Sequence, residues 1–422
     1  MVTLFPHQVE GLKQTEGLES CALYWDMGLG KTFGGSEKMM QYGNRVNLVV
    51  CQKSKVEDWV NHFKEHYDDV IVYNGTKAEC LKRFFDYPYN EKQVCIINYD
   101  LIFRRPELAS LKDFTLMLDE SSLIQNEMSK RSKFILKKLN PKNVILLSGT
   151  PTGGKYERLW SQCRLLGWKI SKDAFWKTYV KYHFDTRNGF PLKIIDGYKN
   201  VDRLKRKLRE YGAVFMKTEE VFDLPAQIDT TIQISSSKEY RKFRRNAIVS
   251  VNNVELVGDT TLTKMLYERQ LCGQYNAEKF QAFRDLLEST DDRLIVFYNF
   301  TAEMKELHKI AFEEYERPCS LINGSIKNLE AYENCDDSVT LIQYQAGSMG
   351  LNLQKANKII YFTPPLSSEL FEQSKKRIHR IGQNKPCFYY YIVCSKSVEE
   401  NIYATLKMRK DYTEVLFEGD NH

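Results

Sequence analysis

The sequence predicts an α/β fold built from two parallel-sheet lobes with a mostly helical segment between them. Two groups of short apolar runs support this prediction, one within residues 21–147 and the other within residues 294–393, and stretches with helical spacing separate the runs of each group. Between about residue 152 and residue 285 the strand pattern disappears. We therefore expect a first lobe at 1–151, a helical insertion at 152–285 and a second lobe at 286–422.

The apolar runs of both lobes are continuous, which is typical of strands that are buried on both faces of a parallel sheet. The expected strands are 21–25, 46–51, 94–99, 115–118 and 144–147 in the first lobe, and 294–298, 319–322, 339–342, 358–362 and 387–393 in the second. Ligands of such sheets bind beyond the carboxyl ends of the strands. The loops that follow the strands are therefore the expected functional rim.

The composition limits the class of protein. A chain of 422 residues is too long for one compact core. Its 61 basic residues face 55 acidic ones, so a nucleic-acid surface would have to come from local clusters of charge. Ten cysteines without a Cys-x-x-Cys pair argue against a zinc ribbon and against a disulfide framework. No run has the length of a membrane span or the pattern of a secretory leader, so we expect a cytoplasmic protein with no membrane partner.

A glycine-rich turn, Asp-Met-Gly-Leu-Gly-Lys-Thr at residues 26–32, follows the first expected strand. This order of strand, turn and helix forms nucleotide phosphate sites, because the small residues let backbone N–H groups surround phosphate oxygens. Gly28, Leu29 and Gly30 would form the cradle, Lys31 would reach the β- and γ-phosphates, and Thr32 would hold Mg²⁺. The general phosphate-loop pattern has glycine at position 25, where this chain has tryptophan, so a second motif is needed to support ATP.

Two acids at the end of the expected strand 115–118 supply that second motif. Asp119 is positioned to hold Mg²⁺, and Glu120 to polarise the attacking water. Each motif alone could be an ordinary glycine-rich connection or a solvated strand end, but their order predicts a site for ATP and Mg²⁺. Gln8 lies upstream of the phosphate loop and is a candidate reader of the adenine edge, with a surface glutamine on an amphipathic helix as the alternative.

The second lobe has no phosphate loop, and its candidate site is a pair of arginines. A helix is expected to begin after the two prolines at 364–365 and to end at Gly382, with Gln373, Arg377 and Arg380 on one face. Two permanently charged guanidiniums on one face could stabilise a γ-phosphate during its transfer. The alternative is a pair of surface arginines on a basic helix.

Two helices expected in the insertion are basic on one side. The first spans 201–212 and carries Arg206, and the second spans 238–251 and carries Arg241 and Arg245. Contact with nucleic-acid phosphates is one interpretation of these charges. The other is a solvated helix face.

Taken together, the motifs resemble those of a known family. The matching segments are 5–8, 26–32, the strand 49–54 with Trp59 after it, 119–120 with Asn126, 148–151, 296–297, 347–353 and 373–383. The most specific of these are Arg-Ile-His-Arg-Ile-Gly-Gln at 377–383 and Gly-Leu-Asn-Leu at 350–353. On these residues nearly the whole chain resembles the SWI/SNF-type branch of helicase superfamily two.

The resemblance implies two RecA-like lobes that bind ATP between them and step along DNA, mostly duplex or forked DNA. It assigns Gly350 to ATP binding, and it places nucleic acid near Lys53, Ser54, Asn126, Thr150 and Asn352. A motor of this size is similar to those of bacteria and their viruses, where DNA replication, recombination or repair would be its setting. Protein partners are not indicated.

The chain departs from the family pattern after its paired acids. Ser121 and Ser122 stand where the family usually has Ala-His, at a position that links the ATP state to the next motif. Two alternatives to a DNA motor remain, and the departure at Ser121 and Ser122 bears on the second of them. One is the same motor acting on RNA, which the 377–383 segment disfavours, and the other is a nucleotide-gated DNA clamp with little turnover.

Overall fold

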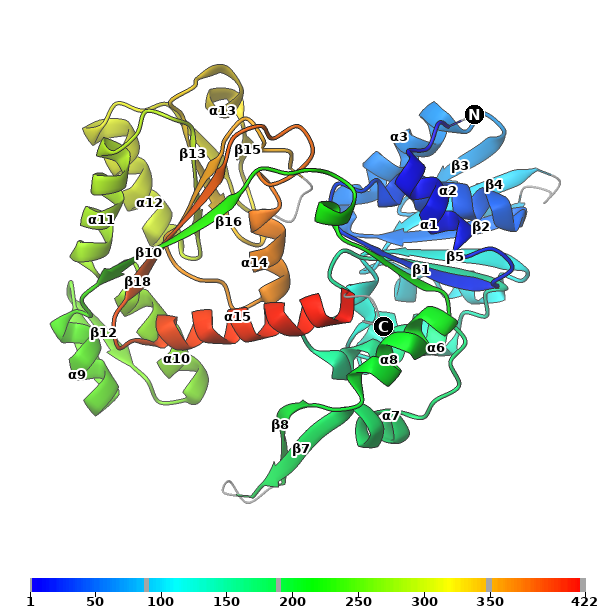
Figure 1. The fold of residues 1–422 in the computed structure, drawn as a ribbon, viewed down its shortest axis with the longest axis horizontal. Helices are drawn as coiled ribbons and strands as arrows, with labels where there is room; N and C mark the ends of the chain where they lie inside the picture. Colours follow the sequence, from blue (N-terminus) through cyan, green and yellow to red (C-terminus); the bar gives the residue numbers. More distant parts are fainter. Residues whose placement is uncertain (1, 87–90, 187–190, 347–350, 418–422) are drawn as a thin grey trace. The chain divides into compact units, whose positions relative to one another are not determined.

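A computed structural model describes residues 2–86, 91–186, 191–346 and 351–417 (Figure 1). The chain divides into two compact units. One comprises Met1–Val221 together with Asp411–His422, and the other comprises Phe222–Lys410. Each unit is built on its own seven-stranded sheet and is described by itself below.

The sheet of the first unit is entirely parallel and has the strand order β3-β4-β2-β5-β6-β1-β9. Its strands are β1 Ser20–Trp25, β2 Val46–Cys51, β3 Val70–Asn74, β4 Lys92–Asn98, β5 Phe114–Asp119, β6 Asn143–Leu147 and β9 Ala213–Met216. The central strands β1, β2, β5 and β6 are almost completely buried. The prediction of a parallel α/β lobe is thereby confirmed, and all five strands that were expected in it are present.

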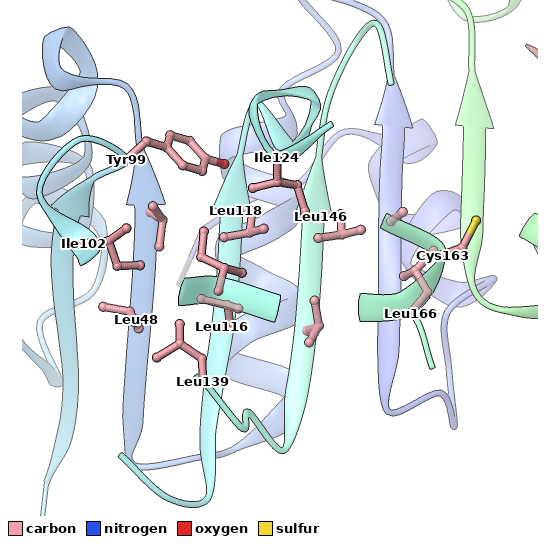
Figure 2. Close-up of a cluster of buried hydrophobic side chains, with 14 of the residues drawn as sticks. Leu48, Tyr99, Ile102, Leu116, Leu118, Ile124, Leu139, Leu146, Cys163 and Leu166 are labelled. Atoms are coloured by element: carbon pink, nitrogen blue, oxygen red, sulfur yellow. The ribbon is translucent and has the colours of Figure 1, made fainter. Parts of the chain in front are cut away.

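Helices cover both faces of this sheet. They are α1 Pro6–Lys13, α2 Lys31–Tyr42, α3 Val56–His66, α4 Ala78–Asp86, α5 Lys130–Lys137, α6 Trp160–Leu165, α7 Lys172–Tyr179 and α8 Val201–Glu210. One face packs in the apolar cluster of Figure 2, where Leu116 and Leu146 of the sheet lie with Cys163 and Leu166 of α6 and the turn after it. On the other face Gly35 lets α2 approach closely, because a Cβ there would lie 2.8 Å from the Met117 sulfur.

Four strands of the first unit were not expected. β3 and β9 are the edge strands of the sheet, and an antiparallel hairpin is formed by β7 Val180–Asp185 and β8 Leu192–Tyr198. The hairpin strands are mostly exposed, so they lack the continuous apolar run by which the buried strands were recognised. Because β9 belongs to the first sheet, the segment 152–285 contributes strands as well as helices.

The second unit has the strand order β10-β18-β17-β13-β16-β14-β15, in which only the pairing of β14 with β15 is antiparallel. Its strands are β10 Gln227–Ile234, β13 Leu294–Tyr298, β14 Cys319–Ile322, β15 Lys327–Asn328, β16 Val339–Gln343, β17 Lys358–Tyr361 and β18 Cys387–Cys394. The five strands that were expected in the second lobe are present. The edge strand β10 was missed because most of its side chains are exposed and polar.

The helices of the second unit are α9 Lys238–Asn246, α10 Thr261–Cys272, α11 Ala277–Glu288, α12 Thr301–Lys309, α13 Glu330–Asn334, α14 Ser368–Lys375 and most of α15 Val398–Phe417. Helices α11 and α12 pack on one face of the sheet, and α14 with α15 packs on the other (Figure 1). None of the described helices is long and apolar enough to cross a membrane.

The helix expected at 238–251 is shorter than predicted. α9 ends at Asn246, Ala247 takes a left-handed conformation with φ +55°, and the chain then enters a hairpin of β11 Ile248–Val251 and β12 Val254–Val257. Tyr240 and Phe243 are buried as the helical stripe predicted. Val251 continued the stripe by spacing alone, but it lies in a strand, because β-branched residues at 248, 249 and 251 favour the hairpin.

Candidate nucleotide site and nucleic-acid rim

The phosphate loop connects β1 to α2. Gly28 and Gly30 have φ values of +92° and +73°, which L side chains rarely adopt, and Gly30 is the N-cap of α2. The Lys31 Nζ donates hydrogen bonds to the carbonyl oxygens of Trp25 at 2.8 Å and Asp26 at 2.9 Å, so the ammonium lies inside the loop. The loop therefore has the positive φ angles and the enclosed cation that a phosphate site requires.

Trp25, which departs from the general phosphate-loop pattern, is a core residue. Its side chain is fully buried, and Cβ atoms at Gly11 and Gly34 would lie 2.5 Å and 2.7 Å from its ring. Those two glycines let α1 and α2 pack against the indole. Tryptophan at this position fixes the two helices next to the phosphate loop instead of forming part of it.

Gln8 braces the phosphate loop. Its Oε1 accepts from the Phe5 N–H at 2.9 Å, and its Nε2 donates to the Leu29 carbonyl at 3.1 Å and the Gly30 carbonyl at 3.4 Å. A Cβ on Gly30 would lie 2.1 Å from the same Nε2, and Gln8 is 2% exposed. The structure thus places Gln8 against the loop with its amide bonded to backbone, and recognition of adenine by this residue stays a prediction.

Asp119 and Glu120 lie at the carboxyl end of β5 and are held by hydrogen bonds from neighbouring elements. The Trp59 indole N–H on α3 donates to the Asp119 Oδ2 at 2.8 Å, and the Ser148 hydroxyl after β6 donates to the Glu120 Oε1 at 2.8 Å. Burial raises the pKa of Asp119, while the indole N–H and the Lys31 cation act to lower it. Lys31 therefore acts electrostatically on the carboxylate that was predicted to hold Mg²⁺.

The backbone at Glu120 is strained and is held by hydrogen bonds from the side chain of Tyr99. Its φ of +59° lies in the left-handed region, which is uncommon for a residue other than glycine. The buried Tyr99 hydroxyl donates to the Asp119 carbonyl at 3.0 Å and to the Glu120 carbonyl at 3.4 Å. Strained residues that their surroundings hold in place are concentrated at functional sites. The sequence placed Tyr99 at the end of an expected strand, on the functional rim, but not its hydrogen bonds, which depend on the pairing of distant strands.

The two serines after Glu120 both have partners. The Ser121 hydroxyl donates to the Gln162 Oε1 at 2.8 Å, and the Ser122 hydroxyl donates to the Glu120 Oε1 at 3.4 Å. Gln162 also donates from Nε2 to the Pro151 carbonyl at 2.8 Å. Gln162 is a residue that the sequence interpretation missed, since it belongs to none of the motifs.

The four residues predicted to meet nucleic acid in the first lobe all follow strands at the same edge of the sheet. Lys53 and Ser54 follow β2 and are exposed, and Asn126 follows β5 and is exposed. Thr150 follows β6 and is 7% exposed, and its backbone N–H donates to the Ser148 hydroxyl at 3.1 Å. A Cβ on Gly149 would lie 3.5 Å from the Lys31 Nζ, so the segment after β6 runs beside the phosphate loop.

The arginines of the second unit do not share a helix face, and that expectation was wrong. α14 ends at Lys375, and the chain then turns, because Lys376 and the residues after it leave helical geometry well before Gly382. Arg377 is 2% exposed and donates to the Leu351 carbonyl at 3.2 Å. Arg380 is half-buried and hydrogen-bonds to Asn352 through the Asn352 Oδ1. The structure thus separates a buried arginine from a more accessible one and joins Arg380 to Asn352. Gly350, assigned to ATP binding, lies outside the described residues.

The basic helices keep part of their expected charge on the surface. Arg206 on α8 and both Arg241 and Arg245 on α9 are exposed. Lys205, a further basic residue of α8, is 4% exposed and lies next to the fully buried Leu204. These arginines lie outside the strand-end loops, and nucleic-acid contact by them stays a prediction.

The loop and the two carboxylates fit ATP with Mg²⁺. A Cβ on Gly28 would meet nothing within 4 Å, so the turn is open toward solvent, and Thr32 at the start of α2 is exposed. The Asp119 carboxylate can accept further bonds beside the one from Trp59. A glycine-rich loop, a lysine and paired acids at strand ends of a parallel sheet define a phosphate-loop nucleotide site.

Comparison with known families confirms this class. The SNF2-related domain family matches residues 7–277, and the helicase conserved C-terminal domain family matches residues 278–382. The first match covers more than half of the chain, and the chain therefore belongs to the SNF2-related family, the SWI/SNF-type branch of helicase superfamily two. It carries the paired domains of an SNF2-type ATPase.

Individual relatives are distant in sequence. The chain is 25% identical over 467 residues to the SWI/SNF-related matrix-associated actin-dependent regulator of chromatin subfamily A member 1 of Mus musculus, covering 97% of this chain and 42% of that protein. It is 25% identical over 466 residues to the ISWI chromatin-remodeling complex ATPase ISW1 of Saccharomyces cerevisiae, covering 97% of this chain and 40% of that protein. The chain thus spans less than half of the length of these relatives.

Among solved structures, the chain is similar to the Sulfolobus solfataricus SWI2/SNF2 ATPase core in complex with dsDNA. The TM-score is 0.46 at 18% sequence identity, and the match covers 99% of this chain and 94% of that one.

Proposed function

We propose that the chain is an ATP-dependent DNA translocase that hydrolyses ATP with Mg²⁺ to move along DNA in replication, recombination or repair. The observation that supports this most is that Lys31, Asp119 and Glu120 lie together at one edge of the first sheet, where the Ser148 hydroxyl hydrogen-bonds to the Glu120 carboxylate. An ATPase of this class needs a phosphate-binding cation, a metal ligand and a base for water in that arrangement. Membership of the SNF2-related family is the reason to expect that the nucleic acid along which the chain moves is DNA.

The roles follow from the chemistry of each side chain. Lys31 would exchange its two carbonyl partners for the β- and γ-phosphate oxygens, and Thr32 with Asp119 would hold Mg²⁺. When bound, Mg²⁺ neutralises the charge that develops on the phosphoryl oxygens. Glu120 would orient the attacking water and accept its proton, with its carboxylate fixed by the Ser148 hydroxyl.

Arg380 is the better candidate for the arginine that stabilises the transferred phosphoryl group. It is half-buried, and its guanidinium hydrogen-bonds to the exposed Asn352, whereas Arg377 is 2% exposed and donates to the backbone carbonyl of Leu351. A transition-state contact needs a guanidinium that can reach a ligand. Arg377 is better suited to a structural role, in which its guanidinium holds the backbone at Leu351.

DNA contact is proposed for the loops that follow β2, β5 and β6. Lys53, Ser54 and Asn126 are exposed there and can donate to phosphate oxygens, as can the exposed Arg206, Arg241 and Arg245 on the two basic helices. The names of both relatives refer to chromatin, which agrees with DNA as the partner. Salt should weaken binding if these cations meet phosphates.

The test is the steady-state ATPase rate with no nucleic acid, with single-stranded DNA, with duplex DNA and with RNA, with Lys31→Ala as the blank. Stimulation by duplex DNA that is lost in Lys31→Ala is the expected result. Stronger stimulation by RNA would identify an RNA motor instead. Tight ATP and DNA binding with a rate at the level of the blank under every condition would identify a nucleotide-gated clamp and refute the motor.

A further inference from the structure

Gln162 on α6 joins three segments that carry the site but are far apart in sequence. Its Oε1 accepts from the Tyr24 hydroxyl of β1 at 2.9 Å and from the Ser121 hydroxyl at 2.8 Å, and its Nε2 donates to the Pro151 carbonyl at 2.8 Å. The side chain is fully buried. The three partners lie beside the phosphate loop, beside Glu120 and at the end of the segment after β6.

The position demands an amide more strictly than a core position normally does. Cys163, the next residue on α6, packs against the sheet face (Figure 2), and Leu159 just before α6 belongs to the same apolar cluster. A polar group in such surroundings costs free energy unless its hydrogen bonds are made. An amide can accept twice and donate as well, which a carboxylate or an aliphatic side chain cannot do. Gln162 meets all three partners at once.

These bonds close a ring around the carboxylate proposed to activate water. Glu120 is covalently followed by Ser121, which bonds to Gln162, and Gln162 bonds to Pro151. The same segment returns to Glu120 through the Ser148 hydroxyl at 2.8 Å. Glu120 has a left-handed backbone conformation, and the ring holds it both through its carboxylate and through the next residue, so it has little freedom to relax. A shift of the segment 148–151 therefore acts on Glu120 by two routes.

We propose that Gln162 is a positioning residue for hydrolysis, which holds Glu120 in register with the segment 148–151 through Ser121 and Pro151. This inference rests on the proposed function, because it assigns Glu120 to the attacking water. Gln162 touches no reacting atom and acts only through its partners. Loss of the amide should lower kcat and leave the affinity for ATP unchanged, since the phosphate loop bonds are made by other residues.

The experiment compares Gln162→Leu with Ser161→Ala in the full chain. Ser161 is the neighbouring residue on α6, is 1% exposed, and its hydroxyl has no hydrogen-bond partner, so its removal tests the effect of a buried change on the same helix. We expect kcat with duplex DNA to fall about tenfold in Gln162→Leu, with KM for ATP changed less than about twofold, and no change in Ser161→Ala. Equal kcat in both variants would overturn the proposal.

A pH profile separates positioning from a general loss of stability. In Gln162→Glu the carboxyl can donate to the Pro151 carbonyl only when it is protonated. We expect the kcat of this variant to approach that of the wild type at low pH and to fall below it as pH rises, measured at a temperature at which the variant stays folded at every pH. A loss of stability, which for a buried carboxyl also grows as pH rises, would lower the unfolding temperature but leave the kcat of the folded variant unchanged. A profile parallel to that of the wild type would count against the proposal.

Ser121→Ala tests the same ring without changing α6, and it decides the matter if Gln162→Leu does not fold. It should lower kcat in the wild-type background and have no further effect in Gln162→Glu at high pH, because the ring is already open there. Additive effects of the two changes would refute the coupling. A wild-type chain without DNA-stimulated turnover would overturn the proposed function and this inference together, whereas a normal wild-type rate with unaffected variants would overturn this inference alone.

Discussion

The pH dependence of the second unit should follow one buried carboxyl, Glu303. It lies in the first turn of α12 and is fully buried, and its Oε2 accepts from the backbone N–H groups of Asn299 at 3.0 Å and Phe300 at 3.1 Å. The Thr363 hydroxyl donates to the same oxygen at 3.0 Å, while Oε1 has no hydrogen-bond partner. Glu303→Gln keeps the shape and the acceptor and removes the titration.

The magnitude follows from the pKa of Glu303. Burial raises it from the usual 4.5 to about 7, against the lowering effects of the two N–H groups and the Lys279 cation. The folded state then binds more protons than the unfolded state between these two values, so stability decreases as pH rises from about 4.5 to 7 and stays lower above 7. The difference corresponds to about 3 kcal/mol. Relative to the wild type, Glu303→Gln should therefore gain about 3 kcal/mol between pH 4.5 and pH 8.

The assay is hydrogen exchange of the peptides that cover β13 and α12, measured from pH 5 to pH 8 in urea. Exchange of these peptides isolates the second unit, which matters because a chain of two units need not unfold in one step. Glu313→Gln is the matched control, since Glu313 is an exposed carboxylate just beyond α12. A stability difference between Glu303→Gln and the wild type that is the same at every pH would refute the reasoning.

Two further predictions concern the nucleotide site. Trp59→Phe keeps the ring packing but removes the N–H that donates to Asp119, so we expect the pKa of Asp119 to rise further. The ATPase of this variant should then need about tenfold more Mg²⁺, which a titration of kcat with Mg²⁺ would detect. An unchanged titration would contradict the prediction. Arg380→Ala should lower kcat by about a thousandfold or more at an unchanged unfolding temperature. Arg377→Ala should instead destabilise the second unit by about 1–3 kcal/mol, because it removes a buried hydrogen-bond partner of the Leu351 carbonyl. The opposite pattern would reverse the two assignments.

The sequence was sufficient for the parts of the fold that follow a local rule. Central strands such as β2 and β13 are continuous apolar runs, and the polar residues at their ends must lie at one edge of a parallel sheet. Edge strands such as β10 obey no such rule, because one side of them faces water and their side chains are polar. The end of α14 was also missed, since the 3.6-residue spacing of Gln373, Arg377 and Arg380 continues past the last helical residue.

The candidate site likewise contains residues that a local motif reveals and residues that no local motif reveals. Lys31, Asp119 and Glu120 were found because each sits in a short motif, but the groups that hold them come from elsewhere in the chain. Trp59 is 60 residues from Asp119, and Tyr99 is 20 residues from it. Such pairings depend on strand order, which local spacing does not determine.

The departure at Ser121 and Ser122 has a different meaning once the partners of the hydroxyls are known. From sequence, the absence of Ala-His suggested an altered link between the ATP state and the next motif, and this was the sign that favoured a gated clamp. In the structure Ser121 bonds to Gln162 and Ser122 bonds to Glu120, so hydroxyl groups supply a link where the family usually has other residues. Alanine at position 121 would remove one of these bonds. The departure therefore replaces one connection with another, and it gives no support to a chain that binds ATP without turning it over.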